Sequence, residues 1–246
     1  MTHILITGAS SGIGESLALH YAKTGVTLSL CARNEERLLE VTRRCQDKGA
    51  TVHPRIMNVT DKDAMSEWII AADKSLPLTL VIANAGIGLN ARGYKAAEET
   101  FDVNIHGVVN TIHPILPRME KRRTGQIALV SSMAGYVGLP SAPPYSASKN
   151  FVRAYGEALR GQLAPLGVKI NVICPGFVRS RLTERNRFKM PFLMDAPQAA
   201  RVIADGLAHN KGRIAFPWPM MVMVRTLTLL PYPLYEWISR RLPDKA

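Results

Sequence analysis

Cysteine is scarce in this chain, and its few thiols form no recognisable set of metal ligands. The 246 residues include only Cys31, Cys45 and Cys174, an odd number without the close spacing of a metal site. Each lies in or beside an apolar or helical run, which is typical of reduced thiols in a cytoplasmic protein. We therefore expect no metal.

The N-terminus lacks the pattern of a secretory signal. Residues 1–8 run directly into a strand and a glycine turn, which leaves no room for a basic segment followed by an apolar one. The chain also lacks a linker-like run that would divide it, so one α/β domain is expected at this length. The predicted location is cytoplasmic.

Acidic residues are the minority charge, with 19 Asp and Glu against 31 Lys and Arg and a formal net charge of +12. This excess favours anionic ligands, among them nucleotide phosphates, acyl carriers, anionic lipids and nucleic acids. The basic clusters at residues 118–123 and 179–189 are not interleaved with aromatic residues, so no nucleic-acid partner is expected. We interpret the first as an exposed helix end, and the second as either a solvated loop or an anion-binding loop.

The sequence does contain a glycine-rich turn between a short apolar strand and a helical pattern. The strand covers residues 4–6, and segment 7–14 reads Thr-Gly-Ala-Ser-Ser-Gly-Ile-Gly. Glycines there permit a tight turn and a close backbone approach to a pyrophosphate, which free N–H groups of the helix N-terminus stabilise. The expected cofactor contacts in this turn are Gly8, Ser10, Ser11, Gly12, Ile13 and Gly14.

Arg33 follows the second predicted strand, residues 27–31. In a dinucleotide fold this strand ends at the adenosine ribose, where an acidic residue suits the 2′-hydroxyl of NAD and an arginine suits the 2′-phosphate of NADP. Arg33 therefore predicts NADP(H) as the cofactor. The alternative is that Arg33 only begins the solvated helix predicted for residues 35–48.

Strands and helices alternate along the rest of the chain. Further strands are predicted at residues 52–57, 78–83, 126–131 and 168–174, and long helices at 98–118 and 145–163. Alternation without hairpin turns indicates a Rossmann-type doubly wound parallel sheet of about seven strands with helices on both faces. Ligands bind such sheets at the carboxyl ends of strands, which here precede Gly8, Arg33, Asn84, Ser132 and Pro175.

Tyr145 and Lys149 are four residues apart in a helix-compatible run, so they share one helical face. A tyrosine titrates near pH ~10, and proton transfer at neutral pH requires stabilising the phenolate by roughly 3 units, or ~4 kcal/mol. An adjacent lysine cation supplies part of this and lowers the pKa of the tyrosine. Taken alone, such a pair is more often two residues that lie together by chance on a surface helix.

Asn104 is a polar residue among apolar neighbours. It is therefore either a core amide with satisfied hydrogen bonds or part of a site.

Together these motifs resemble those of the short-chain dehydrogenase/reductase family over roughly residues 3–216. The shared set is TGxxxGxG at residues 7–14, Asn-Ala-Gly at 84–86, Asn104, Ser132, Tyr145 with Lys149, and Pro-Gly at 175–176. The resemblance implies that Tyr145 is the general acid and base and that Lys149 lowers its pKa and holds the nicotinamide ribose. It also implies that Ser132 positions the substrate carbonyl and that Asn104 supports a water relay to Lys149.

The resemblance implies further cofactor contacts. They are Asn58, Val59, Asn84, Ala85, Gly86, Tyr145, Lys149, Pro175, Gly176, Val178 and Ser180. Three positions depart from the commonest family pattern: Asn58 replaces an aspartate, Ala83 an asparagine and Ser180 a threonine. Because an amide oxygen or a serine hydroxyl offers similar hydrogen bonds, these departures bear on cofactor affinity more than on catalysis.

The expected function is an NADPH-dependent oxidoreductase that transfers hydride between the nicotinamide and a carbonyl or alcohol substrate. The alternative is a catalytically idle nucleotide-binding module that docks to partners, against which the complete set of Asn104, Ser132, Tyr145 and Lys149 counts. The family resemblance further implies a homodimer or homotetramer paired through the helices at 98–118 and 145–163.

Residues 217–246 form an apolar extension beyond the catalytic domain expected at 1–216. Residues 220–230 contain only Arg225, Thr226 and Thr228 as polar residues, so a helix there needs cover. It is too short to span a bilayer, which takes ~20 apolar residues, and prolines flank it. We favour a segment that caps the substrate cleft or the dimer edge over an interfacial membrane anchor, of which the nearby aromatic and basic residues are typical. Either role predicts an apolar, lipid-like substrate.

Overall fold

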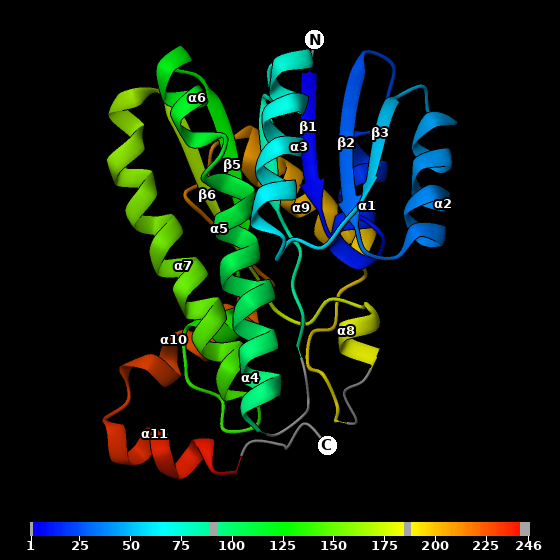
Figure 1. The fold of residues 1–246 in the computed structure, drawn as a ribbon. Helices are drawn as coiled ribbons and strands as arrows, with labels where there is room; N and C mark the ends of the chain where they lie inside the picture. The colour runs from blue at the N-terminus through cyan, green and yellow to red at the C-terminus, as the bar shows by residue number, and fades with distance from the viewer. Residues whose placement is uncertain (1, 89–92, 185–187, 242–246) are drawn as a thin grey trace.

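The computed structural model describes residues 2–88, 93–184 and 188–241 (Figure 1). It contains a seven-stranded, fully parallel sheet in the order β3-β2-β1-β4-β5-β6-β7. The predicted Rossmann-type doubly wound α/β fold is therefore confirmed. The strands are β1 Thr2–Thr7, β2 Val26–Ala32, β3 Thr51–Ile56, β4 Leu80–Ala83, β5 Gly125–Val130, β6 Val168–Pro175 and β7 Arg213–Phe216.

Helices cover both faces of the sheet (Figure 1). The α-helices are α1 Gly12–Tyr21, α2 Glu35–Gln46, α3 Lys62–Ser75, α4 Tyr94–Phe101, α5 Gly107–Ile112, α6 Leu116–Arg122, α7 Pro143–Leu163, α8 Arg181–Glu184, α9 Ala196–Ala208, α10 Trp218–Leu229 and α11 Tyr232–Ser239. Leu17 of α1 and Ile203 of α9 belong to the core on one face, whereas Ile69 of α3 and Val152 of α7 belong to the core on the other. Two apolar layers thus hold the sheet between them.

Strands β1 and β4 are buried almost throughout, as expected of parallel strands that helices cover on both sides. β2 and β4 flank β1 on opposite sides, so the order of strands reverses between β1 and β4. A crevice forms at such a reversal, outside the carboxyl ends of the strands, and it is where ligands bind in open α/β sheets.

The prediction of one long helix at residues 98–118 is wrong, because the structure divides this region into several helices. α4 is followed by a π-helix at Asp102–His106, then by α5 and, beyond Pro114, by α6. His113 still has helical backbone and donates its N–H to the carbonyl of Val109, but Pro114 has no N–H to continue these hydrogen bonds, so α5 ends at Ile112. The π-helix is a wider turn of the kind often found at functional sites, and it carries Asn104.

The basic cluster at residues 118–123 was predicted to be an exposed helix end, and this holds for only some of its residues. Lys121 and Arg123 are exposed, whereas Arg118 and Arg122 pair with the buried Asp73. Arg122 Nη1 lies 2.6 Å from one carboxylate oxygen of Asp73, and Arg118 Nε pairs with the other. Asp73 also accepts the backbone N–H of Leu78 at 2.9 Å, which contributes to β4 beginning later than predicted, at Leu80. Burial opposes ionisation of Asp73, but the two arginines outweigh it and hold its pKa below the ordinary value.

Asp73→Asn removes the charge that both guanidinium groups share, so we expect it to destabilise the fold by about 2 kcal/mol or more. Chemical denaturation measures the effect, with Glu67→Gln, at an exposed position of the same helix, as the matched control. An Asp73→Asn midpoint equal to that of the control would contradict a stabilising role for this cluster.

The C-terminal helices α10 and α11 lie beyond the carboxyl ends of the strands (Figure 1). Met220 and Val224 of α10 are buried against Met133, and the Tyr235 hydroxyl of α11 donates to the carbonyl of Gly138. Both contacts are with the segment between β5 and α7. Across the described residues, no helix is both long enough and apolar enough to cross a membrane.

Candidate active site

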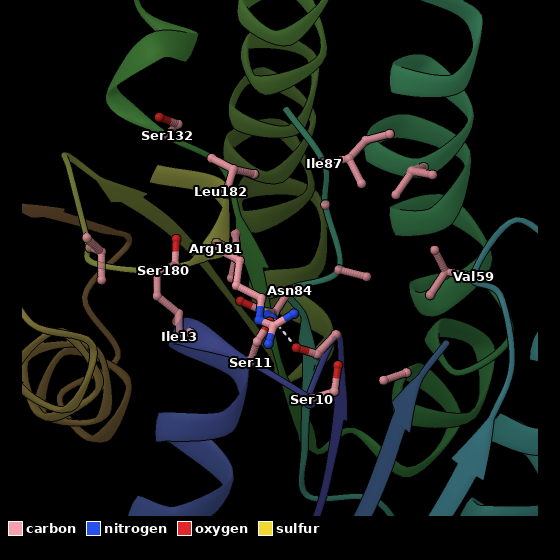
Figure 2. A pocket seen from close by; sticks show the side chains of 18 of the residues that line it. Ser10, Ser11, Ile13, Val59, Asn84, Ile87, Ser132, Ser180, Arg181 and Leu182 are labelled. Atoms are coloured by element: carbon pink, nitrogen blue, oxygen red, sulfur yellow. Dashed lines mark hydrogen bonds between the residues drawn. The ribbon is translucent and has the colours of Figure 1, made fainter. Parts of the chain in front are cut away.

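A pocket of about 640 Å³ opens at the carboxyl ends of the strands, around the reversal between β1 and β4 (Figure 2). It is lined by most of the residues predicted to bind cofactor or substrate: Gly8, Ser10, Ser11, Gly12, Ile13, Arg33, Asn58, Val59, Asn84, Ala85, Gly86, Ser132, Tyr145, Lys149, Pro175, Gly176, Val178 and Ser180. Two predicted site residues, Gly14 and Asn104, are not among the lining residues. They contact residues that do line the pocket.

The turn after β1 depends on its glycines. Gly8 and Gly12 have φ angles of +66° and +59°, in the left-handed region that favours glycine. A Cβ at Gly14 would lie 2.3 Å from the carbonyl oxygen of Gly8, so Gly14 lets α1 pack against the turn instead of contacting a ligand. Gly12 and Ile13 bring the N-terminus of α1 to the pocket wall, where its N–H groups suit the phosphates of a dinucleotide.

Asn84 fixes this turn to the end of β4 (Figure 2). Its Nδ2 donates to the carbonyls of Thr7 at 3.0 Å and Gly8 at 3.2 Å. Thr7 Oγ1 in turn accepts the backbone N–H groups of Asn84 and Ala85. Asn84 therefore positions the glycine turn, a role that the sequence did not indicate because its partners are more than 70 residues away in the chain.

Two arginines lie at the pocket rim after β2. Arg33 and Arg37 both line the pocket, as does Asn34 between them. Asn34 Oδ1 accepts the N–H of Arg37 at 3.0 Å and so caps α2, which places Arg37 in the first turn of the helix, just after Arg33. Their guanidinium groups suit a phosphate group. Sequence reasoning missed Arg37, although its place in the first turn of the helix after β2 is a signal that could have found it.

The Lys149 ammonium is buried at the end of β5. Its Nζ donates to the carbonyl of Val130 at 3.0 Å. A Cβ on Gly86 would come within 3.1 Å of Nζ and 3.2 Å of Asn104 Oδ1, so the glycine leaves open a space that fits a flat cofactor group. Burial lowers the pKa of Lys149 to about 8, so the side chain is still a cation at neutral pH.

Asn104 is a fully buried amide with every polar atom satisfied. Its Oδ1 accepts the N–H of Ile87 at 2.8 Å, and its Nδ2 donates to the Ile87 carbonyl and, at 3.0 Å, to Ser148 Oγ. Ser148 donates to the carbonyl of Tyr145 at 2.8 Å. The two interpretations of Asn104 are compatible, because a satisfied core amide here ties the loop after β4 to the helix of Tyr145. Sequence reasoning missed Ser148.

Tyr145 is partly buried, and its pKa shift is opposite to the one predicted. Burial raises the pKa of Tyr145, and the hydrogen bond with Ser132 opposes that shift without cancelling it. The Lys149 ammonium lies 5.8 Å from the centre of the tyrosine ring. The prediction considered only the lysine cation, which favours a lower pKa of the tyrosine. It left out the larger effect of burial, which the spacing of the two residues does not reveal. Tyr145 is therefore a neutral phenol at neutral pH and can donate a proton.

A second cavity, of about 240 Å³, shares Ser132 and Tyr145 with the first. Its wall is mostly apolar and comes from the loop after β5, the segment after β6 and α10. The larger apolar lining residues are Met133, Val137, Leu139, Phe177, Leu182, Phe188, Pro191, Met220, Met223, Val224 and Leu227. An apolar group of a substrate can therefore lie next to the hydroxyls of Ser132 and Tyr145.

The predicted basic loop at 179–189 is described except for residues 185–187, which lie outside the described residues. Thr183 Oγ1 accepts the N–H of Ser180 at 2.9 Å and donates to the carbonyl of Val178 at 2.9 Å, which orders the segment before and within α8. Arg181 lines the larger pocket, and Figure 2 shows its side chain extending toward the glycine turn near Ser11. The described part of the loop is thus a wall of the site.

Known proteins similar to this chain share its fold. The sequence profile described as short chain dehydrogenase matches residues 2–190. An uncharacterized oxidoreductase of Myxococcus xanthus is 40% identical over 243 residues, which are 97% of this chain and 96% of that one. A short-chain dehydrogenase from Sphingobium yanoikuyae, solved in complex with NADPH, has a TM-score of 0.82 at 24% identity, covering 92% of this chain and 94% of its own. A short chain dehydrogenase/reductase from Burkholderia phymatum, solved in complex with NAD, has a TM-score of 0.83 at 23% identity, with coverages of 91% and 92%.

The parallel sheet and these matches define an oxidoreductase with a Rossmann-type fold. The chain belongs to the short-chain dehydrogenase/reductase family, as its motifs predicted. Members of this family bind a nicotinamide cofactor, and the two solved relatives carry different ones, NADPH and NAD. The choice between them must therefore come from residues of this chain.

Ser148→Ala removes the hydroxyl that joins Asn104 to the backbone of Tyr145. We expect kcat to fall about ten-fold, the effect of one lost buried hydrogen bond, with little change in cofactor affinity. Steady-state kinetics and cofactor titration measure the two effects, with Asn150→Ala, at an exposed position of the same helix, as the control. Unchanged kcat in Ser148→Ala would exclude this positioning role.

Proposed function

We propose that this protein is an NADPH-dependent reductase of apolar, lipid-like ketones or aldehydes, and that it also catalyses the reverse oxidation. The observation that carries the proposal is that Ser132 and Tyr145 line both the large pocket and the apolar cavity. The cofactor-sized site and the apolar site therefore meet at the two hydroxyls that a carbonyl oxygen needs as hydrogen-bond partners.

Each site residue has a role that follows from its surroundings. When bound, the nicotinamide supplies or accepts the hydride. Ser132 holds the carbonyl oxygen, and Tyr145, a neutral phenol at neutral pH, donates its proton to that oxygen. Lys149 keeps a positive charge beside the tyrosine, which stabilises the phenolate left after proton transfer. Asn104 holds the loop after β4 and, through Ser148, the start of the helix that carries Tyr145 and Lys149.

The preference for NADP(H) rests on Arg33 and Arg37. Both line the pocket after β2, where the adenosine ribose of a dinucleotide lies in folds of this type. Asn34, between them, carries no charge, so the rim suits the 2′-phosphate better than a bare 2′-hydroxyl. Asn58 and Val59 line the same end of the pocket and are proposed to contact the adenine.

Arg33→Ala is expected to weaken NADPH binding by roughly ten-fold to a hundred-fold, because a charge-assisted hydrogen bond contributes roughly 1.5–3 kcal/mol. NADH binding should change far less, since it has no 2′-phosphate. Fluorescence titration of both cofactors measures the ratio, with Arg201→Ala, at an exposed position of α9, as the control. Equal losses for NADPH and NADH would remove this assignment.

Tyr145→Phe is expected to lower turnover by at least about a hundred-fold while leaving NADPH affinity nearly intact, because only the hydroxyl transfers the proton. The test is oxidation of NADPH by the purified protein with a panel of aliphatic, aromatic and long-chain carbonyls, followed by the variant on each compound that reacts. Retention of most of the rate would show that Tyr145 is not the acid. Absence of turnover across the panel, with NADPH bound, would favour the idle binding module.

We further expect a homodimer or homotetramer, paired through α4, α5 and α7. Figure 1 shows these helices side by side on one face of the sheet. Tyr94 of α4 is 92% exposed, and Phe151 of α7 is also exposed. Exposed aromatic residues on adjacent helices are typical of subunit contacts.

A further inference from the structure

The outer sides of α10 and α11 form an exposed apolar surface. Of the thirteen large hydrophobic residues that are exposed in the described part of the chain, seven lie on these two short helices. Leu229 is 83% exposed and Trp218 is 76% exposed, so both side chains extend away from the protein surface. We define the C-terminal apolar surface as Trp218, Val222, Met223, Leu229, Tyr232, Leu234 and Trp237. Such a concentration on one segment is typical of a surface that binds another protein or a membrane.

The charges beside the C-terminal apolar surface are predominantly positive. Arg225 of α10 is exposed, and Arg240 and Arg241 follow α11. Arg241 lies over the Trp237 ring, 3.8 Å from its centre. The only acidic residue of α10 and α11 is Glu236, and it pairs with Arg240 at 2.7 Å. This combination of tryptophan, tyrosine and arginine matches an anionic lipid surface, because the rings suit the headgroup region and the cations suit its charge.

The opposite side of α10 faces the apolar cavity. Met220 and Val224 are buried and line that cavity, and Leu227 lines it one turn further on. Met223 both lines the cavity and belongs to the C-terminal apolar surface, so the cavity reaches the exterior beside this helix. Pro231 separates α10 from α11, and both helices are far shorter than a bilayer requires. The geometry suits two helices lying in the plane of a membrane interface.

We propose that the C-terminal apolar surface docks the protein on an anionic membrane surface. Apolar burial supplies part of the binding free energy, and attraction of the arginines to acidic headgroups supplies the rest. A second copy of the chain is the competing occupant, but it would bring Arg225, Arg240 and Arg241 of both copies to one contact. The docking itself is independent of the proposed function, on which only its consequence rests: the cavity would receive apolar substrates from the lipid.

Vesicle flotation of the full chain tests the proposal. Vesicles of phosphatidylcholine with phosphatidylglycerol should carry the protein, and vesicles of phosphatidylcholine alone should carry far less. Replacing Trp218, Leu229 and Trp237 together by serine should lower the bound fraction roughly ten-fold or more. The matched control replaces Leu39, Ile56 and Val202 by serine, which are exposed hydrophobic residues outside the surface, and should float as the wild type does.

A second measurement keeps the test valid if the serine variant folds poorly. Brominated phosphatidylglycerol should quench the fluorescence of the wild type on vesicle binding, and Trp218→Phe with Trp237→Phe should still float but lose the quenching, because Trp68 lies in the fold. Absence of flotation of the wild type would overturn the proposal, as would quenching that persists in the phenylalanine variant. Light scattering that shows a dimer dissociated by the serine variant, with no wild-type flotation, would assign the surface to a second copy.

Discussion

The buried ammonium of Lys149 is the constraint on which the site depends. Burying a cation costs free energy unless polar groups surround it, and here the Val130 carbonyl accepts a hydrogen bond from the ammonium. The space beside it stays open because residue 86 is a glycine, and Asn104 Oδ1 borders the same space. Loss of the Asn104 amide would leave buried polar partners unsatisfied, and a side chain at residue 86 would fill the space beside the ammonium. The end of β5, the loop after β4 and the π-helix must therefore be built together.

Local patterns explain which parts of the site could be predicted from the sequence. The glycine turn and the pair Tyr145 and Lys149 are defined by spacing within one turn or one helix, so their placement follows from short-range geometry. The parallel, doubly wound sheet follows from alternation of strand and helix without hairpin turns, since a helical crossover lets the next strand run in the same direction. These features need no knowledge of distant residues.

What could not be predicted depends on distant contacts. Asn104 finds its partners on Ile87 and Ser148, and Asp73 finds Arg118 and Arg122, all far along the chain. The raised pKa of Tyr145 has the same origin, because burial is a property of the assembled fold and not of the i, i+4 spacing. The break after α5 was available from Pro114, but the π-helix before it carries no comparable marker.

The two roles considered for the C-terminal segment are not exclusive once α10 has a fixed orientation. Positions 220, 223, 224 and 227 recur with helical spacing and face the cavity, whereas 218, 222, 225 and 229 lie on the exposed side. A helix with apolar residues around most of its circumference has no solvent-facing stripe, so the sequence could not say which side the fold would cover. The described residues cover one side of α10 and leave the other exposed. The apolar side that remains exposed carries an energetic cost in water, and this cost is removed only when a second apolar phase meets it.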